Sequence, residues 1–220
     1  MGGVPEVMNR RDFIEKSMLA AGGILLSASG IDALAKPANT NKMKIVLITG
    51  SPRRTGNTNH MADQFTKGAQ EAGHEVFRFD AANREVKPCL GCNHCGMDGP
   101  CVYQDDFSTI LRPKLEEADM VVFCSPMYYF GFSAQIKTVI DRFYAINYKI
   151  HGSKKTAFLM AYANTSAKDA EAMTAHYKTI ANYMGWEDAG MVIAPGIWPV
   201  GAVKGTKYAQ QAYELGKKLK

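Results

Sequence analysis

The residues most suited to chemistry are four cysteines within thirteen positions, Cys89, Cys92, Cys95 and Cys101, spaced C-x2-C-x2-C-x5-C. Thiolates this close can converge on one small centre, and the glycines among them let the chain wrap around it. The same residues could instead remain free thiols, form disulfides, or bind zinc, whose structural sites more often join two separated C-x2-C pairs. His94 lies in the same segment and is expected to be an exposed loop residue, because four cysteines already complete a site.

A second segment whose residues could bind a ligand covers residues 50–58 and has the sequence G-S-P-R-R-T-G-N-T. Its glycines let the backbone approach an anion, its hydroxyl and amide side chains can donate hydrogen bonds, and the helix predicted after it adds unpaired N–H groups. The segment contains neither G-x-x-x-x-G-K-S/T nor G-x-G-x-x-G, so a nucleoside-triphosphate loop and a dinucleotide fingerprint are both absent. A monophosphate fits it best, and the alternative is a solvated turn that starts a helix.

Both segments lie in a chain that alternates strand and helix patterns from Met43 onwards. Short, β-branched apolar runs predict strands over residues 43–49, 74–79, 120–124, 156–161 and 191–194. Apolar residues at helical spacing lie between and after these runs, whereas residues 80–104 show no periodicity. The alternation predicts an α/β fold, a five-stranded parallel sheet with helices on both faces. Ligands of such a sheet bind beyond the carboxyl ends of its strands, here at the loops after Thr49, Cys124 and Ala161.

Three parts of the sequence together resemble one protein family. The loop at 50–58, the segment Ser125-Pro126-Met127-Tyr128-Tyr129 and the segment 134–142 resemble the flavodoxin-like, NADPH-dependent FMN reductase family, with similarity from about Met43 to Tyr144. The resemblance implies the flavodoxin-like strand order 2-1-3-4-5 and FMN as cofactor. It assigns the FMN phosphate to Ser51, Arg53, Gly56, Asn57 and Thr58, the ring to Pro126, Met127, Tyr128 and Tyr129, and its far edge to the loop around Asn164.

The cysteine spacing resembles that of the iron-sulfur flavoproteins, a branch of the same group. That resemblance implies a 4Fe-4S cluster held by Cys89, Cys92, Cys95 and Cys101, which would act as a one-electron relay between the flavin and a partner. Free thiols, disulfides and zinc remain the alternatives.

Four other residues with reactive or charged side chains are given structural roles. Lys137, Asp141 and Arg142 lie close together on a predicted helix, where a local ion pair or helix packing explains them. Cys124 lies in an apolar strand and is interpreted as a small core residue.

The N-terminus resembles a twin-arginine export signal. Arg10, Arg11, Phe13 and Ile14 match that pattern, Glu15 departs from it, and a Gly- and Ala-rich apolar stretch leads to Ala33-Leu34-Ala35. The alternatives are a membrane anchor and a chance amphipathic helix. Because the twin-arginine route carries folded proteins, the signal predicts a prosthetic group and a location in the periplasm or cell envelope.

Composition and length set the remaining limits. With 220 residues, 46% hydrophobic and 21% charged, the chain is neither disordered nor a polytopic membrane protein, and it holds one core. We predict a signal peptide over residues 1–35, a linker over 36–42 and one flavodoxin-like FMN-binding domain over 43–220, with a cysteine-rich insertion at 85–104. The net charge of +5 is spread along the chain and gives no reason to expect a nucleic-acid partner.

The sequence thus predicts an FMN-dependent oxidoreductase that takes electrons from NAD(P)H or another donor and passes them to a quinone or other small acceptor. The competing interpretation is a non-enzymatic electron carrier that docks with a redox protein partner. A third is an anion-binding or structural domain without FMN. Family members commonly assemble as dimers or tetramers, so a homo-oligomer is expected.

Overall fold

The computed structural model describes residues 42–220. The predicted export signal over residues 1–35 and the predicted linker up to residue 41 lie outside the described residues. Within residues 42–220, no helix combines the length and the apolar character needed to cross a lipid bilayer.

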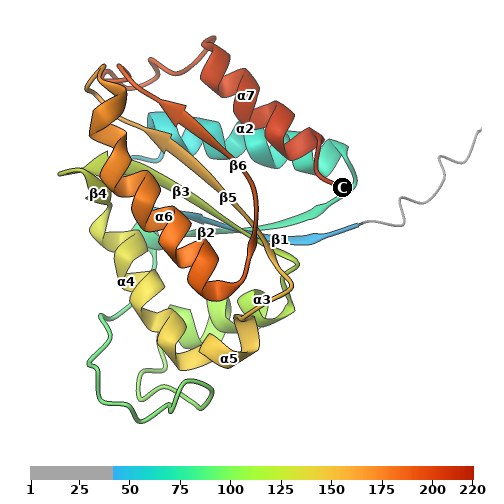
Figure 1. The fold of residues 1–220 in the computed structure, drawn as a ribbon, viewed down its shortest axis with the longest axis vertical. Coiled ribbons are helices and arrows are strands. Elements are labelled where there is room, and N and C mark those ends of the chain that lie inside the picture. The colour runs from blue at the N-terminus through green and yellow to red at the C-terminus, as the bar shows by residue number, and fades with distance from the viewer. Residues whose placement is uncertain (1–41) are drawn as a thin grey trace, which may run out of the picture. The chain divides into compact units, whose positions relative to one another are not determined.

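Five parallel strands form the centre of the described domain, in the order β2-β1-β3-β5-β6 (Figure 1). Their bounds are β1 Lys44–Thr49, β2 Glu75–Asp80, β3 Met120–Tyr128, β5 Lys155–Ala161 and β6 Glu187–Ala194. Numbered along the chain, these strands have the predicted order 2-1-3-4-5, which confirms the flavodoxin-like α/β fold. A sixth, short strand, β4 (Gly131–Phe132), turns back antiparallel against the end of β3, where Phe132 faces Met127.

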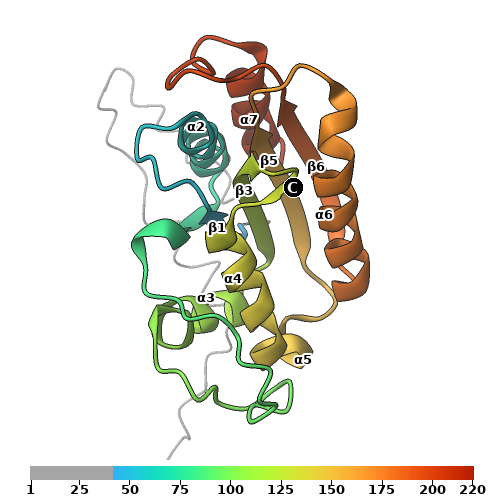
Figure 2. The same ribbon diagram turned by 90° about the vertical axis from the view of Figure 1, so that its left-hand side faces the viewer.

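Helices cover both faces of this sheet, as predicted. The α-helices are α2 Asn57–Glu71, α3 Arg112–Glu117, α4 Ala134–Arg142, α5 Asn147–Ile150, α6 Glu171–Met184 and α7 Lys207–Lys217. Single turns of 3-10 helix occur at Ala81–Asn83, Phe143–Ile146 and Ala167–Ala170, and a π-helix over Phe107–Leu111 leads into α3. Helices α2 and α7 lie on one face, and α4 and α6 lie on the other (Figure 2).

The core is divided by the sheet into two apolar layers. In β1, Ile45 and Leu47 pack with α2 and α7, whereas Val46 and Ile48 pack toward the α4 and α6 side. Successive strand residues point to opposite faces, so a strand covered on both faces must be apolar at every position. This is the reason that the continuous apolar runs predicted the central strands well.

Two strands, β3 and β6, are each four residues longer than predicted. β3 continues to Tyr128 because Ser125 and Pro126 still pair with β5 and the residues after them pair with β4. β6 begins at Glu187, four positions before the predicted start at Met191, although its first residues are polar. β6 is an edge strand, so its first residues need not be apolar and covered on both faces of the sheet.

Candidate functional site

The loops after β1, β5 and β6 and the last residues of β3 meet at the carboxyl edge of the sheet and enclose a cleft of about 280 Å³. Its lining consists of Ser51, Arg53, Gly56, Asn57, Thr58, Pro126, Met127, Tyr128, Ala161, Tyr162, Ala163, Ile197 and Trp198. The location is the one expected for a ligand site in an open parallel sheet. One end of the cleft is polar and the other is apolar and aromatic.

The polar end is the loop between β1 and α2. The Gly50 amide donates to the Cys124 carbonyl at 2.9 Å, and the Gly56 amide donates to the Arg53 carbonyl at 2.8 Å, so the loop forms a tight turn. A Cβ at Gly56 would lie 2.9 Å from that same carbonyl oxygen, which explains the glycine. Helix α2 begins at Asn57 with no side-chain cap on its first N–H groups. These N–H groups and the positive end of the helix dipole are available to an anion.

Buried polar side chains that the sequence analysis did not single out hold this loop. Asn59, 3% exposed, donates from Nδ2 to the Arg53 carbonyl at 2.8 Å. The Ser133 hydroxyl donates to the Gly50 carbonyl at 3.0 Å, and the Ser133 amide donates to the Ser125 hydroxyl at 3.1 Å. The loop is therefore fixed from α2 and from the start of α4, with its geometry set before any ligand binds.

The apolar end of the cleft includes a segment that the sequence analysis missed. Ile197 and Trp198 follow β6, and the Ile197 amide donates to the Tyr162 carbonyl at 2.8 Å. Trp198 is 72% exposed, which leaves its indole face free for a planar ligand. The signal for this segment was available, because the fifth predicted strand ends at the same edge of the sheet as the other four.

Eight of the ten residues that the resemblance assigned to FMN line the cleft, and Tyr129 and Asn164 do not. Tyr129 is fully exposed at the tip of the β3–β4 hairpin with a positive φ of 46°. The Asn164 side chain instead donates to Asp169 at 2.7 Å. Asn57 reaches across the cleft mouth, where its Nδ2 donates to the Pro199 carbonyl at 2.8 Å and its Oδ1 accepts the Val203 amide.

The four cysteines of the insertion surround a second, much smaller pocket of about 20 Å³. They are free thiols, with Cys89 and Cys92 exposed and Cys95 and Cys101 half-buried. Within residues 42–220, however, no three His, Cys, Asp or Glu side chains come close enough together to hold a metal ion. The structure therefore gathers the predicted ligands around one pocket without forming a ligand shell. His94 is exposed, as predicted.

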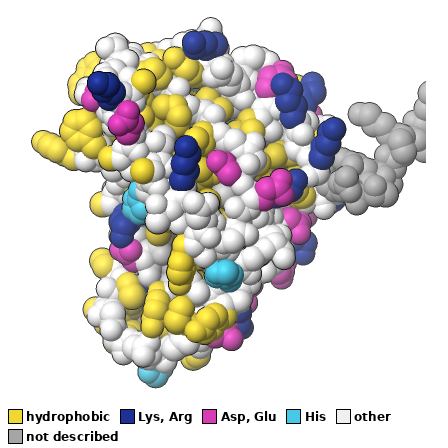
Figure 3. Space-filling view, in the orientation of Figure 1, with side chains coloured by type: hydrophobic (Ala, Val, Ile, Leu, Met, Phe, Trp, Pro, Cys, Tyr) yellow, Lys and Arg dark blue, Asp and Glu magenta, His cyan; other side chains and the backbone are white. Residues whose placement is uncertain are grey.

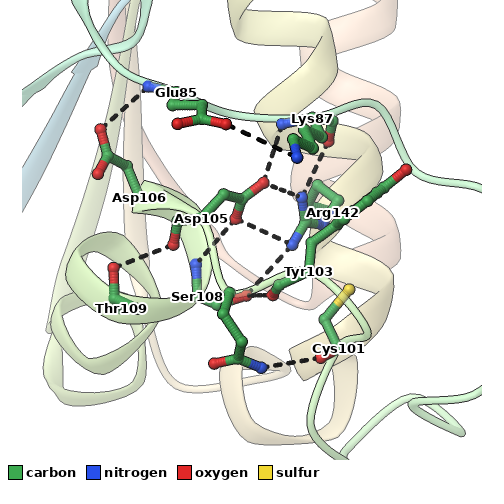
Figure 4. A network of polar contacts seen from close by, with 10 residues as sticks. Glu85, Lys87, Cys101, Tyr103, Asp105, Asp106, Ser108, Thr109 and Arg142 are labelled. Carbon is green, nitrogen blue, oxygen red and sulfur yellow. Dashed lines mark hydrogen bonds and ion pairs between the residues drawn. The ribbon is translucent and has the colours of Figure 1, made fainter.

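A buried ion pair lies behind the cysteine pocket, and it corrects the interpretation of Arg142. Lys137 and Asp141 form the expected local pair at 2.5 Å, but Arg142 pairs with Asp105, 37 positions away, at 2.7 and 3.2 Å (Figure 4). Both side chains are at most 3% exposed. Burial by itself would raise the pKa of Asp105, but hydrogen bonds from Arg142 and from the Lys87 amide lower it below its ordinary value.

Cys124 is fully buried in β3, as predicted for a small core residue. Burial raises the pKa of its thiol to about 12, so it stays protonated at neutral pH. Its Sγ lies 3.1 Å from the Thr58 carbonyl oxygen, beneath the first turn of α2. Cys124 therefore supports the cleft from below and is separate from the four cysteines of the insertion.

Comparisons with known proteins agree with this geometry. Residues 43–204 match the protein family described as NADPH-dependent FMN reductase. The chain is 32% identical over 179 residues to an iron-sulfur flavoprotein of Archaeoglobus fulgidus, covering 80% of this chain and 79% of that protein. It is 41% identical over 100 residues to an iron-sulfur flavoprotein of Methanocaldococcus jannaschii, covering 46% of this chain and 51% of that protein. The chain thus spans about half the length of the latter relative.

Solved structures share the fold. An NAD(P)H:quinone oxidoreductase from Methanothermobacter marburgensis superposes with a TM-score of 0.63 at 17% identity, covering 81% of this chain and 100% of that one. At this level of identity, the likeness establishes the arrangement of strands and helices.

Proposed function

Because this chain belongs to the NADPH-dependent FMN reductase family, we propose that it is an FMN-dependent oxidoreductase. It takes electrons from NAD(P)H or another donor and passes them to a quinone or another small acceptor. The observation that carries the proposal is the cleft at the carboxyl edge of the sheet, which has an anion-binding turn at one end and flat apolar side chains at the other.

The residues of the cleft fit the two ends of FMN. At the polar end, the Ser51 hydroxyl, the Arg53 side chain and the uncapped N–H groups of α2 suit a monophosphate. At the other end, Met127, Tyr128 and Trp198 offer faces for a planar ring. When bound, FMN supplies the hydride and single-electron chemistry. The chain's own residues bind the phosphate, orient the ring and exclude water from one of its faces.

The experiment combines a binding titration with a steady-state assay on the purified full chain. We expect stoichiometric FMN binding, and turnover of NADPH or NADH with a quinone in the FMN-loaded protein. Reduction by a protein partner alone, without turnover of small donors, would favour the electron carrier. A protein that stays colourless when offered FMN would remove both interpretations.

The finer proposal concerns the insertion, where Cys89, Cys92, Cys95 and Cys101 hold a 4Fe-4S cluster. Two observations support it: the four thiols are free and line one pocket, and the two relatives described above are named iron-sulfur flavoproteins. The pocket is too small for a cluster as it stands, so the loop must rearrange around one. Iron and acid-labile sulfide analysis of anaerobically purified protein tests this proposal, and zinc in place of iron would overturn it.

The location and the assembly of the protein are also proposals. We propose export by the twin-arginine route, supported by Arg10 and Arg11. Replacing both with lysine should leave the protein in the cytoplasm, as cell fractionation would report.

For assembly, we propose a homo-oligomer. The proposal is supported by the exposed aromatic tip of the β3–β4 hairpin, which includes Tyr129 and Phe130. Figure 3 shows apolar side chains that project at this edge of the molecule. Light scattering gives the mass directly, and a monomer at micromolar concentration would contradict the proposal.

A further inference from the structure

The Asp105–Arg142 pair joins the two ends of the cysteine-rich insertion. Before the cysteines, the Lys87 amide donates to Asp105 Oδ2 at 2.9 Å, and the Lys87 carbonyl accepts from Arg142 at 2.9 Å. After them, Arg142 donates to the Ser108 hydroxyl at 3.2 Å, which itself donates to the Tyr103 carbonyl at 2.6 Å. Figure 4 shows these contacts converging on the guanidinium. The base of the insertion is therefore tied to α4 by one buried side chain.

The same residue also forms part of the wall of the cysteine pocket. Arg142 lines that pocket together with all four cysteines, whereas its partner Asp105 does not. The guanidinium stacks 4.8 Å from the centre of the Phe107 ring and 5.3 Å from that of Tyr103, so aromatic faces shield it from water. Its Nε–H is buried and has no hydrogen-bond partner. The residue at the wall of the pocket is thus a buried cation that is held in an ion pair with Asp105.

Such a wall suits an anionic occupant. Four thiolates around a metal centre carry net negative charge, and outer-shell donors and charges orient the ligands and tune the centre. Apart from the cysteines, the tyrosines and Arg142, the only titratable side chain in the lining is that of His94. The buried positive charge of this pocket therefore comes from α4, outside the insertion.

We propose that Arg142 is the positioning residue of the cysteine site: it closes the base of the insertion through Asp105 and places a positive charge beside the thiolates that bind a metal centre. This inference rests on the proposed metal-binding role of the four cysteines. It assigns to α4 a part in a site whose ligands all lie elsewhere in the chain.

The test is a titration of the metal-free full chain with Co²⁺ alone, followed by thiolate-to-cobalt charge-transfer absorption. Arg142→Met should weaken Co²⁺ binding by about 10- to 100-fold, the usual effect of removing an outer-shell partner. Arg142→Lys, which keeps the charge but loses the fork of donors, should recover part of that loss. The matched control is Arg78→Met, because Arg78 also pairs with carboxylates, Asp63 and Asp80, and none of these three residues lines the cysteine pocket.

A second variant covers the case in which Arg142→Met does not fold. Asp105→Leu combined with Arg142→Met replaces a buried pair with apolar side chains, an exchange that proteins often tolerate. It also lacks the hydrogen bonds from Arg142 to the Lys87 carbonyl and the Ser108 hydroxyl, which tie both ends of the insertion to α4, so it should lose Co²⁺ affinity in the same way. Wild-type affinity in either folded variant would overturn the inference.

A further measurement separates this inference from a purely structural role and from the cluster proposal. In reconstituted Arg142→Met protein, which loses the cation and keeps the Asp105 carboxylate, the cluster's reduction potential should be more negative, because reduction adds negative charge. If wild-type protein binds Co²⁺ but takes up no iron and sulfide, the cluster proposal fails and the Arg142 inference stands. If it does not bind Co²⁺ at all, both fail.

Discussion

The cleft at the sheet edge and the cysteine pocket are built in different ways. The larger cleft lies at the ends of strands, and neighbouring backbone groups, a helix start and short-range turns form its polar end. The cysteine pocket lies in a segment without strand or helix between Arg84 and Asp105, and a buried side-chain pair from distant parts of the chain supports it.

This difference makes the cleft a preformed site and leaves the cysteine site able to adjust to a ligand. The loop between β1 and α2 is held by hydrogen bonds from Asn59 and Ser133, so its donors are in place before a ligand binds. The insertion is fixed at its base by Arg142 and Asp105, while Leu90 within it is 63% exposed. Fixed ends and an exposed middle allow thiols to adjust around a metal centre, which the cleft could not do for FMN.

The largest expected effect is a complete loss of iron binding at one site with no change in FMN binding at the other. Cys92→Ser removes one of the four thiols and should abolish iron binding, because a cluster of this kind needs all its ligands. FMN binding should be unchanged, since Cys92 lines the cysteine pocket and not the cleft. Iron, sulfide and flavin analysis of the same preparation measures both. Stoichiometric iron in the variant would show that the cysteines do not hold it.

The next effect tests whether the base of the insertion depends on its ion pair. Arg142→Met leaves the Asp105 carboxylate buried without its charged partner, and we expect a loss of about 3–5 kcal/mol in the free energy of unfolding. Denaturant titration measures it, with Lys137→Met, from an exposed pair of the same helix, as the control that should change little.

The stability contribution of the Asp105–Arg142 pair should also depend on pH. The pKa of Asp105 is lowered in the folded protein, so the pair contributes fully above the ordinary carboxyl pKa of about 3.9 and is lost as the pH falls through the lower folded value. The stability difference between wild type and Arg142→Met should therefore persist at neutral pH and shrink only in acid. A difference that vanished near neutrality would contradict this account.

A smaller effect, on the affinity for FMN, is expected from a substitution in the loop between β1 and α2. Ser51→Ala removes one charge-assisted donor, worth about 1.5–3 kcal/mol, so the affinity for FMN should fall about tenfold or more. The iron content should not change, which is the reverse of the pattern expected for Cys92→Ser. Fluorescence titration with FMN provides the measurement, and undiminished affinity would remove Ser51 from the site.

A still weaker effect on FMN affinity is expected from a substitution of Trp198, the aromatic residue of the cleft that the sequence analysis missed. Trp198→Ala removes an exposed face that we expect to stack on the ring, worth about 0.5–1.5 kcal/mol, so FMN affinity should fall by roughly two- to tenfold. Asn164→Ala is the matched control, because the Asn164 side chain bonds to Asp169 outside the cleft. A larger loss for Asn164→Ala than for Trp198→Ala would reverse our assignment of this wall.

The sequence by itself determined the apolar centres of the strands and the polar turn at the end of the cleft, and the strand order followed from the family resemblance. Buried parallel strands need an apolar residue at every position, so their pattern is written in consecutive residues such as those from Ile45 to Ile48. The turn from Gly50 to Thr58 is equally local, because its donors are its own backbone and the helix that follows.

Only the tertiary structure decided how the rest is arranged. The partnership of Arg142 with Asp105 spans 37 positions, and no local pattern distinguishes it from the neighbouring Lys137–Asp141 pair. The strand order predicts that the loop after β6 reaches the same edge of the sheet. Only packing brings Trp198 to the wall of the cleft, where the neighbouring Ile197 amide bonds to the Tyr162 carbonyl. These contacts join segments that meet only when the sheet and its helices have packed, so packing rather than the order of residues selects the partners.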